Sequence, residues 1–493
     1  LTTTSETGGE QFQDMGAILF DADKDGDLDL YIARGGYQSK PNTVPYQDQF
    51  LENDGRGNFA FNAAAIPSNY TSKSCVRAID YDKDGDLDLF IAGRVEPWNY
   101  PKAVSSYLYR NDSKPGQVKF TDVTTQVAKD LTNIGLVCDA LFTDFDNDGW
   151  PDLVLAGEWM PLTFLKNDKG FFSNVTEGSG IAGQVGWWNS IAAGDFDNDG
   201  DIDYIVGNLG QNSFYKATAQ YPVSIYAKDF DQNQSYDALI SVYLPASQQD
   251  TARKEFPAPG RDDIVGQMVR IRSKFNSYKS YATVTMDGLF TREQMQGAQV
   301  LRATNLSSSY CRNDGNGKFT LAPLPFTAQF SALNGMITDD FDGDGNLDII
   351  FNTNDYSTEV GTGRYDALNG LMLKGDGKGN FTPQPMLESG IYIPGNGKAM
   401  INLRGSNEKY LLAAGQNRGR LKVFELKNNI TNISIHPDEV SAEIIFTNGS
   451  KRRQEFYYGF SFLSQSSRFL TINKNVRSVT ISNNNGGHRT VTF

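Results

Sequence analysis

Short apolar runs and short polar loops alternate along most of the 493-residue chain. The runs, such as GAILF at 16–20, LYIA at 30–33 and YIVGN at 204–208, are rich in aromatic and β-branched side chains. Runs of this length and composition are typical of buried β-strands. The pattern therefore predicts an all-β protein made of many short strands.

One nine-residue phrase recurs between these runs. Its strong copies read DADKDGDLD at 21–29, DYDKDGDLD at 80–88, DFDNDGWPD at 144–152, DFDNDGDID at 195–203 and DFDGDGNLD at 340–348. A weaker copy, DFDQNQSYD at 229–237, keeps polar side chains at the odd positions but lacks the glycine. Because each strong copy lies between two apolar runs, it predicts a loop that joins two strands.

A second phrase falls between the first ones, at 50–59, 108–120, 164–172, 310–319 and 371–381. In each, an apolar strand runs into Asn-Asp-Gly, Gly-Asp-Gly or a close variant, and the chain then continues to a Phe. These turn residues tolerate the positive φ that a tight hairpin needs. One repeat therefore holds an Asp-rich loop and a hairpin, or about four strands.

Four-stranded repeats that must hide their edges usually close into a ring. Counting the weak copy and a strand-turn-strand pattern at 397–426, we predict a β-propeller of about seven blades over residues 1–427. The segment near 238–309 departs from the repeat and is partly helical in pattern, so we interpret it as an insertion. From 428 to 493 the Asp-rich loops stop and alternating strands continue, which predicts a separate small β domain. A solenoid of the same units is the alternative arrangement.

The Asp-rich phrase has the chemistry of a calcium loop. Alternate residues of a tightly turning loop project to one side, and Ca²⁺ takes six to eight oxygen ligands. Side chains at positions 1, 3, 5 and 9 and the backbone carbonyl at position 7 would supply them, while the glycine at position 6 permits a turn that a Cβ would penalise. The predicted ligands are Asp21, Asp23, Asp25, Asp27 and Asp29; Asp80, Asp82, Asp84, Asp86 and Asp88; Asp144, Asp146, Asp148, Trp150 and Asp152; Asp195, Asp197, Asp199, Asp201 and Asp203; and Asp340, Asp342, Asp344, Asn346 and Asp348.

A metal-free turn is the alternative, since Asp and Asn are common turn residues. Four carboxylates packed together without a cation cost several kcal/mol in repulsion and desolvation, so we favour metal. We predict about five Ca²⁺ ions, with a sixth position at Asp229–Asp237 left open. Five such ions would bring the net charge from −14 to about −4.

The charge pattern excludes some partners. Lys and Arg form no stripe, so this acidic chain is not expected to bind nucleic acid. No segment has the ~18 consecutive apolar residues that a membrane-spanning helix needs. The sequence starts at Leu1 without a targeting pattern, so we expect that any such segment was removed or not included.

Groups of residues typical of a catalytic site are scarce in the sequence. His436 and His488 both lie in the predicted C-terminal domain, which excludes histidine-based catalysis within the propeller. Cys75, Cys138 and Cys311 are far apart, and buried unpaired thiols are favoured over a bridge between two of them. We predict that the chain is not an enzyme. The alternative is a calcium-assisted polysaccharide lyase or glycosidase that uses paired carboxylates, or Arg and Tyr.

Four tryptophans are candidates for stacking on sugars or for anchoring a protein partner: Trp98, Trp159, Trp187 and Trp188. Packing in the core is favoured for the adjacent pair at 187–188. Trp98 follows a strand in RVEPWNYPK and is the better surface candidate. A binding role therefore has a carbohydrate version and a protein version.

The loops and their flanking strands resemble the FG-GAP and VCBS repeats of integrin-α-type propellers. The runs GRYDALNGLMLKGDGKGNF at 363–381 and GFSFLSQSSRFL at 459–470 resemble bacterial VCBS-repeat proteins that end in an ASPIC/UnbV-type domain, which are common in Bacteroidetes. The chain departs from that pattern in its weak sixth loop, a missing seventh loop and the absence of an N-terminal signal.

The resemblance implies a calcium-stabilised extracellular propeller, exported or held at the bacterial cell surface. It implies protein partners such as an outer-membrane transporter or a secretion complex, with glycans as a further kind of partner. We therefore expect a binding or scaffold protein in which calcium is structural.

Overall fold

The computed structural model describes residues 12–247, 251–358, 362–427 and 431–493. It is 42% strand and 10% helix, so the prediction of an all-β chain is confirmed. The predicted first residues of the two domains, 1 and 428, lie outside the described residues. In the described ranges, no helix is long and apolar enough to cross a membrane.

Four four-stranded antiparallel sheets and one five-stranded sheet carry the repeat, and a three-stranded sheet follows them. Their strands are β1 (Asp14–Phe20), β2 (Asp29–Arg34), β3 (Gln49–Asn53) and β4 (Phe59–Phe61); β5 (Ser72–Ile79), β6 (Asp88–Val95), β7 (Tyr107–Asn111) and β8 (Phe120–Asp122); β9 (Leu136–Thr143), β10 (Asp152–Met160), β11 (Thr163–Asp168) and β12 (Phe171–Asn174); β14 (Ser190–Gly194), β15 (Asp203–Gly207), β20 (Ser309–Asn313) and β21 (Phe319–Pro323); β22 (Leu333–Asp339), β23 (Asp348–Thr353), β24 (Leu371–Gly375) and β25 (Phe381–Gln384); and β26 (Gly397–Arg404), β27 (Tyr410–Gln416) and β28 (Lys422–Glu425). The short strand β13 (Gly186–Trp187) adds to β10, and the short helices α1 (Thr124–Val127) and α7 (Met386–Ser389) follow β8 and β25.

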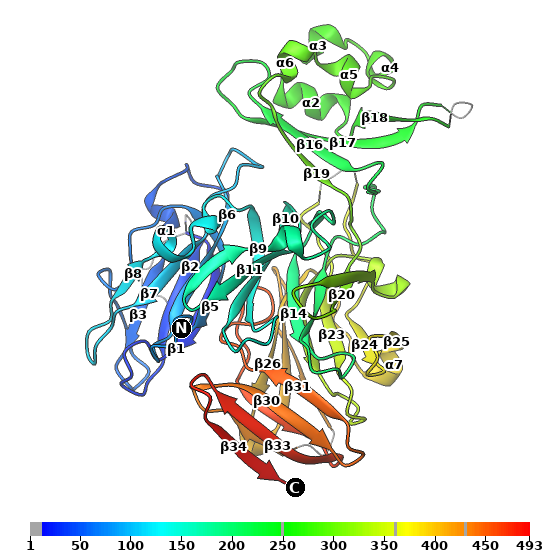
Figure 1. The fold of residues 1–493 in the computed structure, drawn as a ribbon. Coiled ribbons are helices and arrows are strands. Elements are labelled where there is room, and N and C mark those ends of the chain that lie inside the picture. The colour runs from blue at the N-terminus through cyan, green and yellow to red at the C-terminus, as the bar shows by residue number, and fades with distance from the viewer. Residues whose placement is uncertain (1–11, 248–250, 359–361, 428–430) are drawn as a thin grey trace.

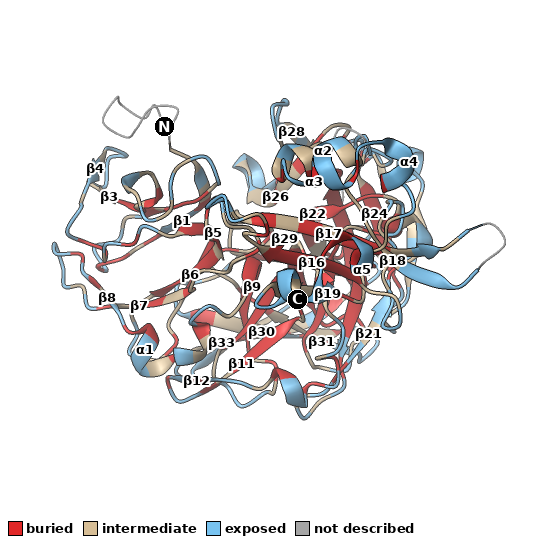
Figure 2. Ribbon diagram, turned by 90° about the horizontal axis from the view of Figure 1, so that it is seen from above, coloured by how far each residue is buried: buried red, intermediate tan, exposed pale blue. Residues whose placement is uncertain are grey.

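The six sheets pack face to face in chain order, with their first strands β1, β5, β9, β14, β22 and β26 adjacent in turn. Aromatic side chains fill the space between them. The Phe120 ring of the second sheet lies 6.1 Å from Phe20 and 5.9 Å from Phe50 of the first. Phe319 of the fourth sheet stacks on Phe164 of the third at 4.1 Å. Buried residues accordingly follow the strands, and exposed ones follow the connecting loops (Figure 2).

A separate lobe interrupts the fourth sheet, because β15 pairs with β20 across residues 208–308. The lobe has a sheet of β16 (Val223–Lys228), β17 (Asp237–Pro245), β18 (Arg253–Pro257) and β19 (Gln299–Ala303) and the helices α2 (Arg261–Gln267), α3 (Ile271–Lys274), α4 (Tyr278–Tyr281), α5 (Met286–Leu289) and α6 (Arg292–Met295). It has its own core, in which Phe230 stacks on Phe290 at 4.3 Å. We call it the inserted lobe.

The lobe changes the predicted count of blades. From the sequence, the 229–237 loop is predicted to belong to a blade and the insertion to begin near residue 238. The structure instead places this loop between β16 and β17 of the inserted lobe, so the insertion begins directly after β15. Six sheets, rather than about seven, follow one another in the described part of the chain, and their closure into a ring stays a prediction.

Residues 431–493 form a C-terminal module. Its sheets are the pair β29 (Thr431–Ser434) and β32 (Phe469–Ile472) and the four strands β31 (Lys451–Glu455), β30 (Glu439–Phe446), β33 (Val476–Asn483) and β34 (His488–Thr492). A core that includes Ile444, Val479 and Ile481 holds the module together. The module lies at the opposite end of the six sheets from the inserted lobe (Figure 1).

The connection between β31 and β32 leaves the module and runs among the six sheets. We call residues 457–467 the central segment. Its Tyr458, Phe460 and Leu463 pack against the cores between the sheets. The Tyr458 carbonyl accepts a hydrogen bond from the backbone N–H of Ala78 in β5 at 3.1 Å. The central segment therefore supplies apolar side chains beside the first strands of the six sheets.

Candidate metal-binding loops

Each strong copy of the Asp-rich phrase joins the first two strands of its sheet. We number them loop 1 (21–29), loop 2 (80–88), loop 3 (144–152), loop 4 (195–203) and loop 5 (340–348). Loop 1 begins where β1 ends, and its last residue, Asp29, opens β2 opposite Phe20. The glycine at position 6 has φ between 86° and 100° in all five loops, as in Gly149 and Gly345. That conformation is left-handed, which explains why glycine recurs there.

In loops 1, 2 and 3, the carboxylate at position 1 accepts hydrogen bonds through one oxygen only, whereas both oxygens of Asp195 and Asp340 accept them. In loop 3, Asp144 Oδ2 accepts a hydrogen bond from the Gly149 N–H at 3.1 Å. Asp21 and Asp80 accept the same bond from their own glycines at 3.1 Å. The other oxygen, Oδ1, is buried without a hydrogen-bond partner in Asp21, Asp80 and Asp144. A buried, unpaired carboxylate oxygen is costly, so these oxygens fit a bound cation.

Further carboxylates gather around position 1. Ligand oxygens lie within 4.8 Å of one another in Asp21, Asp23 and Asp25; in Asp80, Asp82 and Asp88; in Asp144, Asp146 and Asp152; and in Asp195, Asp197 and Asp199. Three carboxylates together with backbone carbonyls make an all-oxygen donor set, which suits a hard divalent cation such as Ca²⁺ or Mg²⁺. In loops 1 to 4, positions 1 and 3 are therefore brought together with either position 5 or position 9, which is part of each predicted ligand set.

The Asp at position 9 also belongs to the sheet framework. In loop 3, Asp152 Oδ2 accepts from the Phe145 N–H at 3.3 Å, and its Oδ1 accepts from the Asn167 N–H of the hairpin at 2.7 Å. The same two bonds recur at the other ninth positions, Asp29, Asp88, Asp203 and Asp348. Position 9 thus fixes the loop to the hairpin of its own sheet, a role that the sequence analysis did not predict.

Burial makes these carboxylates hard to ionise without a cation. Desolvation, together with a smaller effect of neighbouring loop carboxylates, raises the pKa of Asp152 to about 9 and that of Asp203 and Asp348 to about 8. Desolvation also raises the pKa of Asp195 and Asp340 to about 6. A divalent cation would offset both causes, because it favours the charged form of each carboxylate.

Two loops carry an internal positive charge. The Lys166 ammonium contacts Asp146, and it lies 3.0 Å from Asp148 Oδ2. Lys374 makes the same pair of contacts with loop 5, to Asp342 and to Asp344 at 3.0 Å. Both lysines stand one residue before the hairpin turn, where the first sheet has Glu52. Loops 3 and 5 are therefore less negative than loop 1.

Neighbouring loops are linked by a repeated contact from position 4 of one loop to position 7 of the next. Lys24 Nζ lies 2.6 Å from Asp86 Oδ1, and Lys83 lies over the Trp150 ring at 4.6 Å. Asn147 donates to Asp201 Oδ1 at 2.5 Å. Asn198 continues the series by donating to Asn346 Oδ1 at 3.1 Å. All four position-4 residues have φ of 60–62°, which turns their side chains out of their own loop.

The hairpins add a second link between sheets. Asn111 Nδ2 donates to the Ala22 carbonyl of loop 1 at 2.8 Å. Asn167 and Asn313 make the equivalent bonds to position 2 of loops 2 and 3, at 2.9 and 2.8 Å. Each hairpin Asn therefore joins its sheet to the loop of the preceding sheet.

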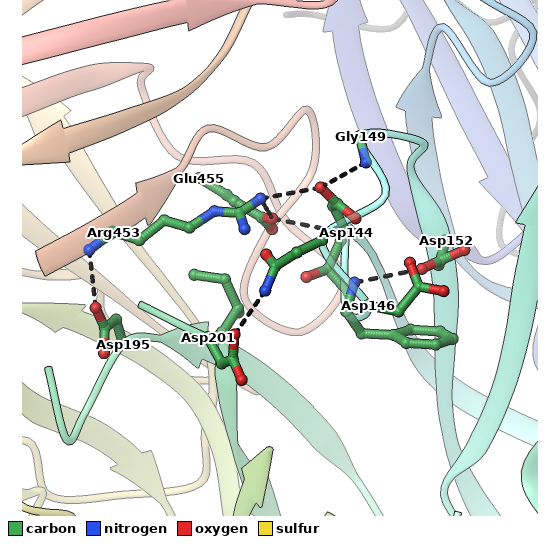
Figure 3. Close-up of polar contacts among 12 residues, drawn as sticks. Asp144, Asp146, Gly149, Asp152, Asp195, Asp201, Arg453 and Glu455 are labelled. Atoms are coloured by element: carbon green, nitrogen blue, oxygen red, sulfur yellow. Dashed lines mark hydrogen bonds and ion pairs between the residues drawn. The ribbon is translucent and has the colours of Figure 1, made fainter. Parts of the chain in front are cut away.

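The C-terminal module contacts four of the five loops at position 1. Arg453 Nη2 donates to Asp144 Oδ2 at 3.1 Å, and its backbone N–H donates to Asp195 Oδ2 at 2.8 Å (Figure 3). Asn484 donates to Asp80 Oδ2 at 2.9 Å, and Asn473 donates to Asp340 Oδ2. These donors approach the Oδ2 side, so the unpaired Oδ1 atoms of Asp80 and Asp144 stay free of them.

The weak copy in the inserted lobe forms the same kind of cluster. Asp229, Asp231 and Asp237 bring ligand oxygens within 4.8 Å of one another, and Oδ1 of Asp231 and Asp237 lacks a hydrogen-bond partner. Gln234 takes the place of the glycine, with φ of 69°. The loop therefore keeps its turn, at the conformational cost that a side chain pays in the left-handed region.

The other side chains that the sequence analysis singled out lie elsewhere. Trp188 is fully buried in the core between the third and fourth sheets, and Trp98 is 47% exposed. The three cysteines are free and buried, and burial raises the pKa of Cys75 and Cys138 to about 12, so these thiols are not poised as nucleophiles. His436 and His488 lie in the C-terminal module.

The family model of the FG-GAP-like repeat matches residues 21–91 and 144–206, which hold loops 1 to 4. FG-GAP-like repeats are therefore present in this chain, as the sequence predicted. A search of curated proteins found no match.

Three solved structures are similar at low identity. An Agrocybe aegerita lectin that recognises non-reducing terminal N-acetylglucosamine is 14% identical over 75% of this chain and 79% of its own, with a TM-score of 0.28. The V. cholerae biofilm matrix protein Bap1 is 11% identical over 97% and 59%, with a TM-score of 0.24. The Bacillus licheniformis rhamnogalacturonan lyase PL11 is 10% identical over 92% and 73%, with a TM-score of 0.33. At TM-scores this low, the likenesses define neither a common fold nor a shared activity.

Proposed function

We propose that this chain is a calcium-stabilised binding or scaffold protein that works outside the cell. One observation carries the proposal. Clusters of carboxylates recur in the loops, and several of their Oδ1 atoms are buried without a hydrogen-bond partner. Loops 1 to 4 lie in the segments that match FG-GAP-like repeats. Five Ca²⁺ ions in loops 1 to 5, and a sixth at Asp229–Asp237, would satisfy these oxygens. Extracellular calcium is plentiful enough to fill even weak sites of this kind.

Calcium has a structural role in this proposal. The loops lie where neighbouring sheets meet, and the position-4 and hairpin contacts join each loop to the next sheet. A cation that fixes one loop therefore also fixes a contact between two sheets. A ring of sheets built in this way would be a rigid platform for a partner.

The proposed setting is the bacterial cell surface, next to an outer-membrane transporter or a secretion complex. This setting, like a VCBS-type repeat and an ASPIC/UnbV-type C-terminal module, comes from the resemblance described above. We propose no catalytic role. Glu455 is a buried acid outside the loops, but its oxygens accept hydrogen bonds from the Asp144 N–H at 3.2 Å and the Tyr457 hydroxyl at 3.0 Å. That carboxylate is engaged in packing the C-terminal module.

Thermal unfolding of the same protein in CaCl₂ and in EDTA, at equal protein concentration, tests the structural role of calcium. We expect calcium to raise the melting temperature strongly, since a ligand that binds only the folded state contributes about 2.7 kcal/mol per site at a hundredfold excess over its Kd. Identical melting curves would overturn the proposal.

The partner is tested by purifying the tagged protein from its source cells in the presence of calcium. We expect it to co-purify with an envelope complex. Recovery of the protein alone would argue against such a partner.

A second candidate function is carbohydrate binding, which one cavity favours. It measures about 210 Å³ and lies where the inserted lobe meets the third sheet, lined by Tyr100, Glu158, Trp187, Tyr215 and Tyr365 among others. Aromatic faces suit the C–H face of a sugar ring, and a carboxylate can accept from its hydroxyl groups. Arg94 pairs with Glu158 at 2.6 Å, so the charge of the carboxylate is balanced and a cationic ligand is less favoured than a neutral sugar.

Binding of neutral oligosaccharides, measured by calorimetry, tests this candidate. Trp187→Ala should abolish the binding, while Trp98→Ala, which removes an exposed tryptophan outside the cavity, should leave it unchanged. Binding of choline in place of sugars would show a cation cage instead, and binding of neither would remove the candidate.

A further inference from the structure

The C-terminal module lies against the Asp-rich loops through contacts that depend on loop geometry. Besides the four contacts to position 1, Arg452 donates to the Gly345 carbonyl at 2.8 Å and Asn475 donates to the Gly343 carbonyl at 2.9 Å. Those two glycines have φ of 100° and 81°, so their carbonyls point toward the module only while loop 5 keeps its turn. Both contacts end on carbonyl oxygens whose direction is set by the backbone of loop 5, so they are lost when that geometry is lost.

The same module supplies the link between the first and last of the six sheets. Gln465 of the central segment exchanges two hydrogen bonds with Leu19 of β1, each 2.8 Å long. Next to it, Ser466 accepts from the Asn402 N–H of β26 at 3.2 Å, and the Ser467 N–H donates to the Asn402 carbonyl at 2.9 Å. Three consecutive residues of the module thus reach β1 and β26.

We propose that cation occupancy of loops 2 to 5 controls docking of the C-terminal module, and through it the connection between the first and last sheets. This inference rests on the proposed function, because it needs the loops to bind calcium. With a cation in place, Asp80 and Asp144 are fixed with Oδ1 toward the ion and Oδ2 toward the module. In loops 4 and 5, Oδ1 of Asp195 and Asp340 accepts backbone N–H bonds within the loop, and the cation holds the other carboxylates of that loop in place around them. Without the cation, the carboxylates of a loop repel one another and the loop opens. The Oδ2 and carbonyl acceptors of the loops then move away from their donors in the module.

Arginine charge does not replace the cation. The Arg453 guanidinium reaches only loop 3, at Asp144 Oδ2, and it also pairs with Glu455 at 3.3 Å, whereas loop 4 receives the Arg453 backbone N–H. One guanidinium divided between Asp144 and Glu455 cannot balance all the carboxylates of loop 3. By linkage, a docked module must in turn raise the affinity of the loops for calcium, since coupling between two equilibria is reciprocal.

Hydrogen exchange of the full chain in CaCl₂ and in EDTA tests the proposal without any variant. In EDTA we expect faster exchange in β31, in the central segment and in the strands it contacts, β1 and β26. Exchange in β30 and β33 should change little, because these strands share the module's own core. Uniform loss of protection would mean unfolding of the whole chain and would overturn the inference, as would unchanged exchange in the central segment of a chain that calorimetry shows to bind calcium. A chain that binds no calcium by calorimetry would instead overturn the proposed function.

Paired variants test the reciprocal effect. Asn473→Ala combined with Asn484→Ala removes two uncharged contacts to position 1, and we expect a three- to tenfold weaker calcium affinity. Asn485→Ala changes an exposed neighbour of Asn484 and should leave the affinity at the wild-type value. Equal affinity in all three proteins would contradict the proposal.

Discussion

At the scale of single residues, the loops depend on side chains that occupy left-handed backbone positions. The sequence reveals the glycine at position 6, because no other residue takes that place in the strong copies. It does not reveal position 4, where Lys24, Lys83, Asn147 and Asn198 all have φ near 60° and point to the next loop. Lys and Asn are common loop residues, so their partners become visible only when neighbouring sheets are placed side by side.

Lys166 is expected to compete with calcium in loop 3. Lys166→Met removes an ammonium that contacts Asp146 and Asp148, so the affinity of this loop for calcium should rise by up to about tenfold, which corresponds to ~1.4 kcal/mol. Calorimetry on the wild type and the variant measures the change. Lys169→Met alters an exposed lysine of the same hairpin and serves as the control; equal affinities in all three proteins would refute the competition.

The buried position-9 carboxylates predict an unusual dependence on pH. Their folded-state pKa, about 9 for Asp152 and about 8 for Asp203 and Asp348, lies above the unfolded value near 4. In EDTA their contribution to stability is therefore fully present at acidic pH and is lost as the pH rises through the folded pKa values. Calcium favours the ionised form, so the difference in melting temperature between CaCl₂ and EDTA should grow from about pH 5 to about pH 9. A constant difference over this range would contradict the prediction.

At the scale of elements, the loops form a connected series rather than independent sites. The contact from Asn147 to Asp201 joins loop 3 to loop 4, where position 7 is predicted to offer its carbonyl to the proposed cation. Order imposed on one loop is therefore passed to the ligand geometry of the next. Strands, Asp-rich loops and hairpins could be predicted from the local sequence, because each depends on a few adjacent residues.

Asn147→Ala should uncouple loops 3 and 4. We expect calcium binding to wild-type protein to be cooperative, with a Hill coefficient above one, and the variant to show a lower coefficient. Asn42→Ala changes an exposed asparagine with a similar φ of 57° and controls for the backbone effect. Calcium titration followed by tryptophan fluorescence suits the measurement, since Trp150 lies within the series. Independent sites in the wild type would disprove the coupling.

At the scale of the whole molecule, strand pairing departed from what chain order suggested. The 229–237 loop has the spacing of a blade loop, yet β15 passes over it to pair with β20, and the loop lies in a lobe with its own core. Docking of the C-terminal module on the loops was equally hidden, because Arg453 and Asp144 meet across 309 residues of chain. Contacts between distant segments leave no local pattern in a single sequence.

The Asp229–Asp237 loop lies beside the lobe's own core, away from the core that the lobe shares with β6, β9 and β10, which predicts a separable calcium site. Asp231→Asn should reduce the number of bound calcium ions by one and leave the melting temperature of the six-sheet body unchanged. Asp146→Asn, the same change at position 3 of loop 3, should lower that melting temperature by several degrees. Native mass spectrometry counts the ions and calorimetry follows unfolding; an equal shift for both variants would show that the lobe and the body unfold together.

The bonds between Gln465 and Leu19 span 446 residues of chain. During synthesis, the amino-terminal sheet leaves the ribosome long before Gln465 is made. Its contact with the central segment therefore forms only when the chain is nearly complete. Contacts this far apart in sequence form late and slowly. In the proposed setting outside the cell, that delay would keep the polypeptide unfolded enough to cross a membrane and would leave final assembly to the compartment where it is released.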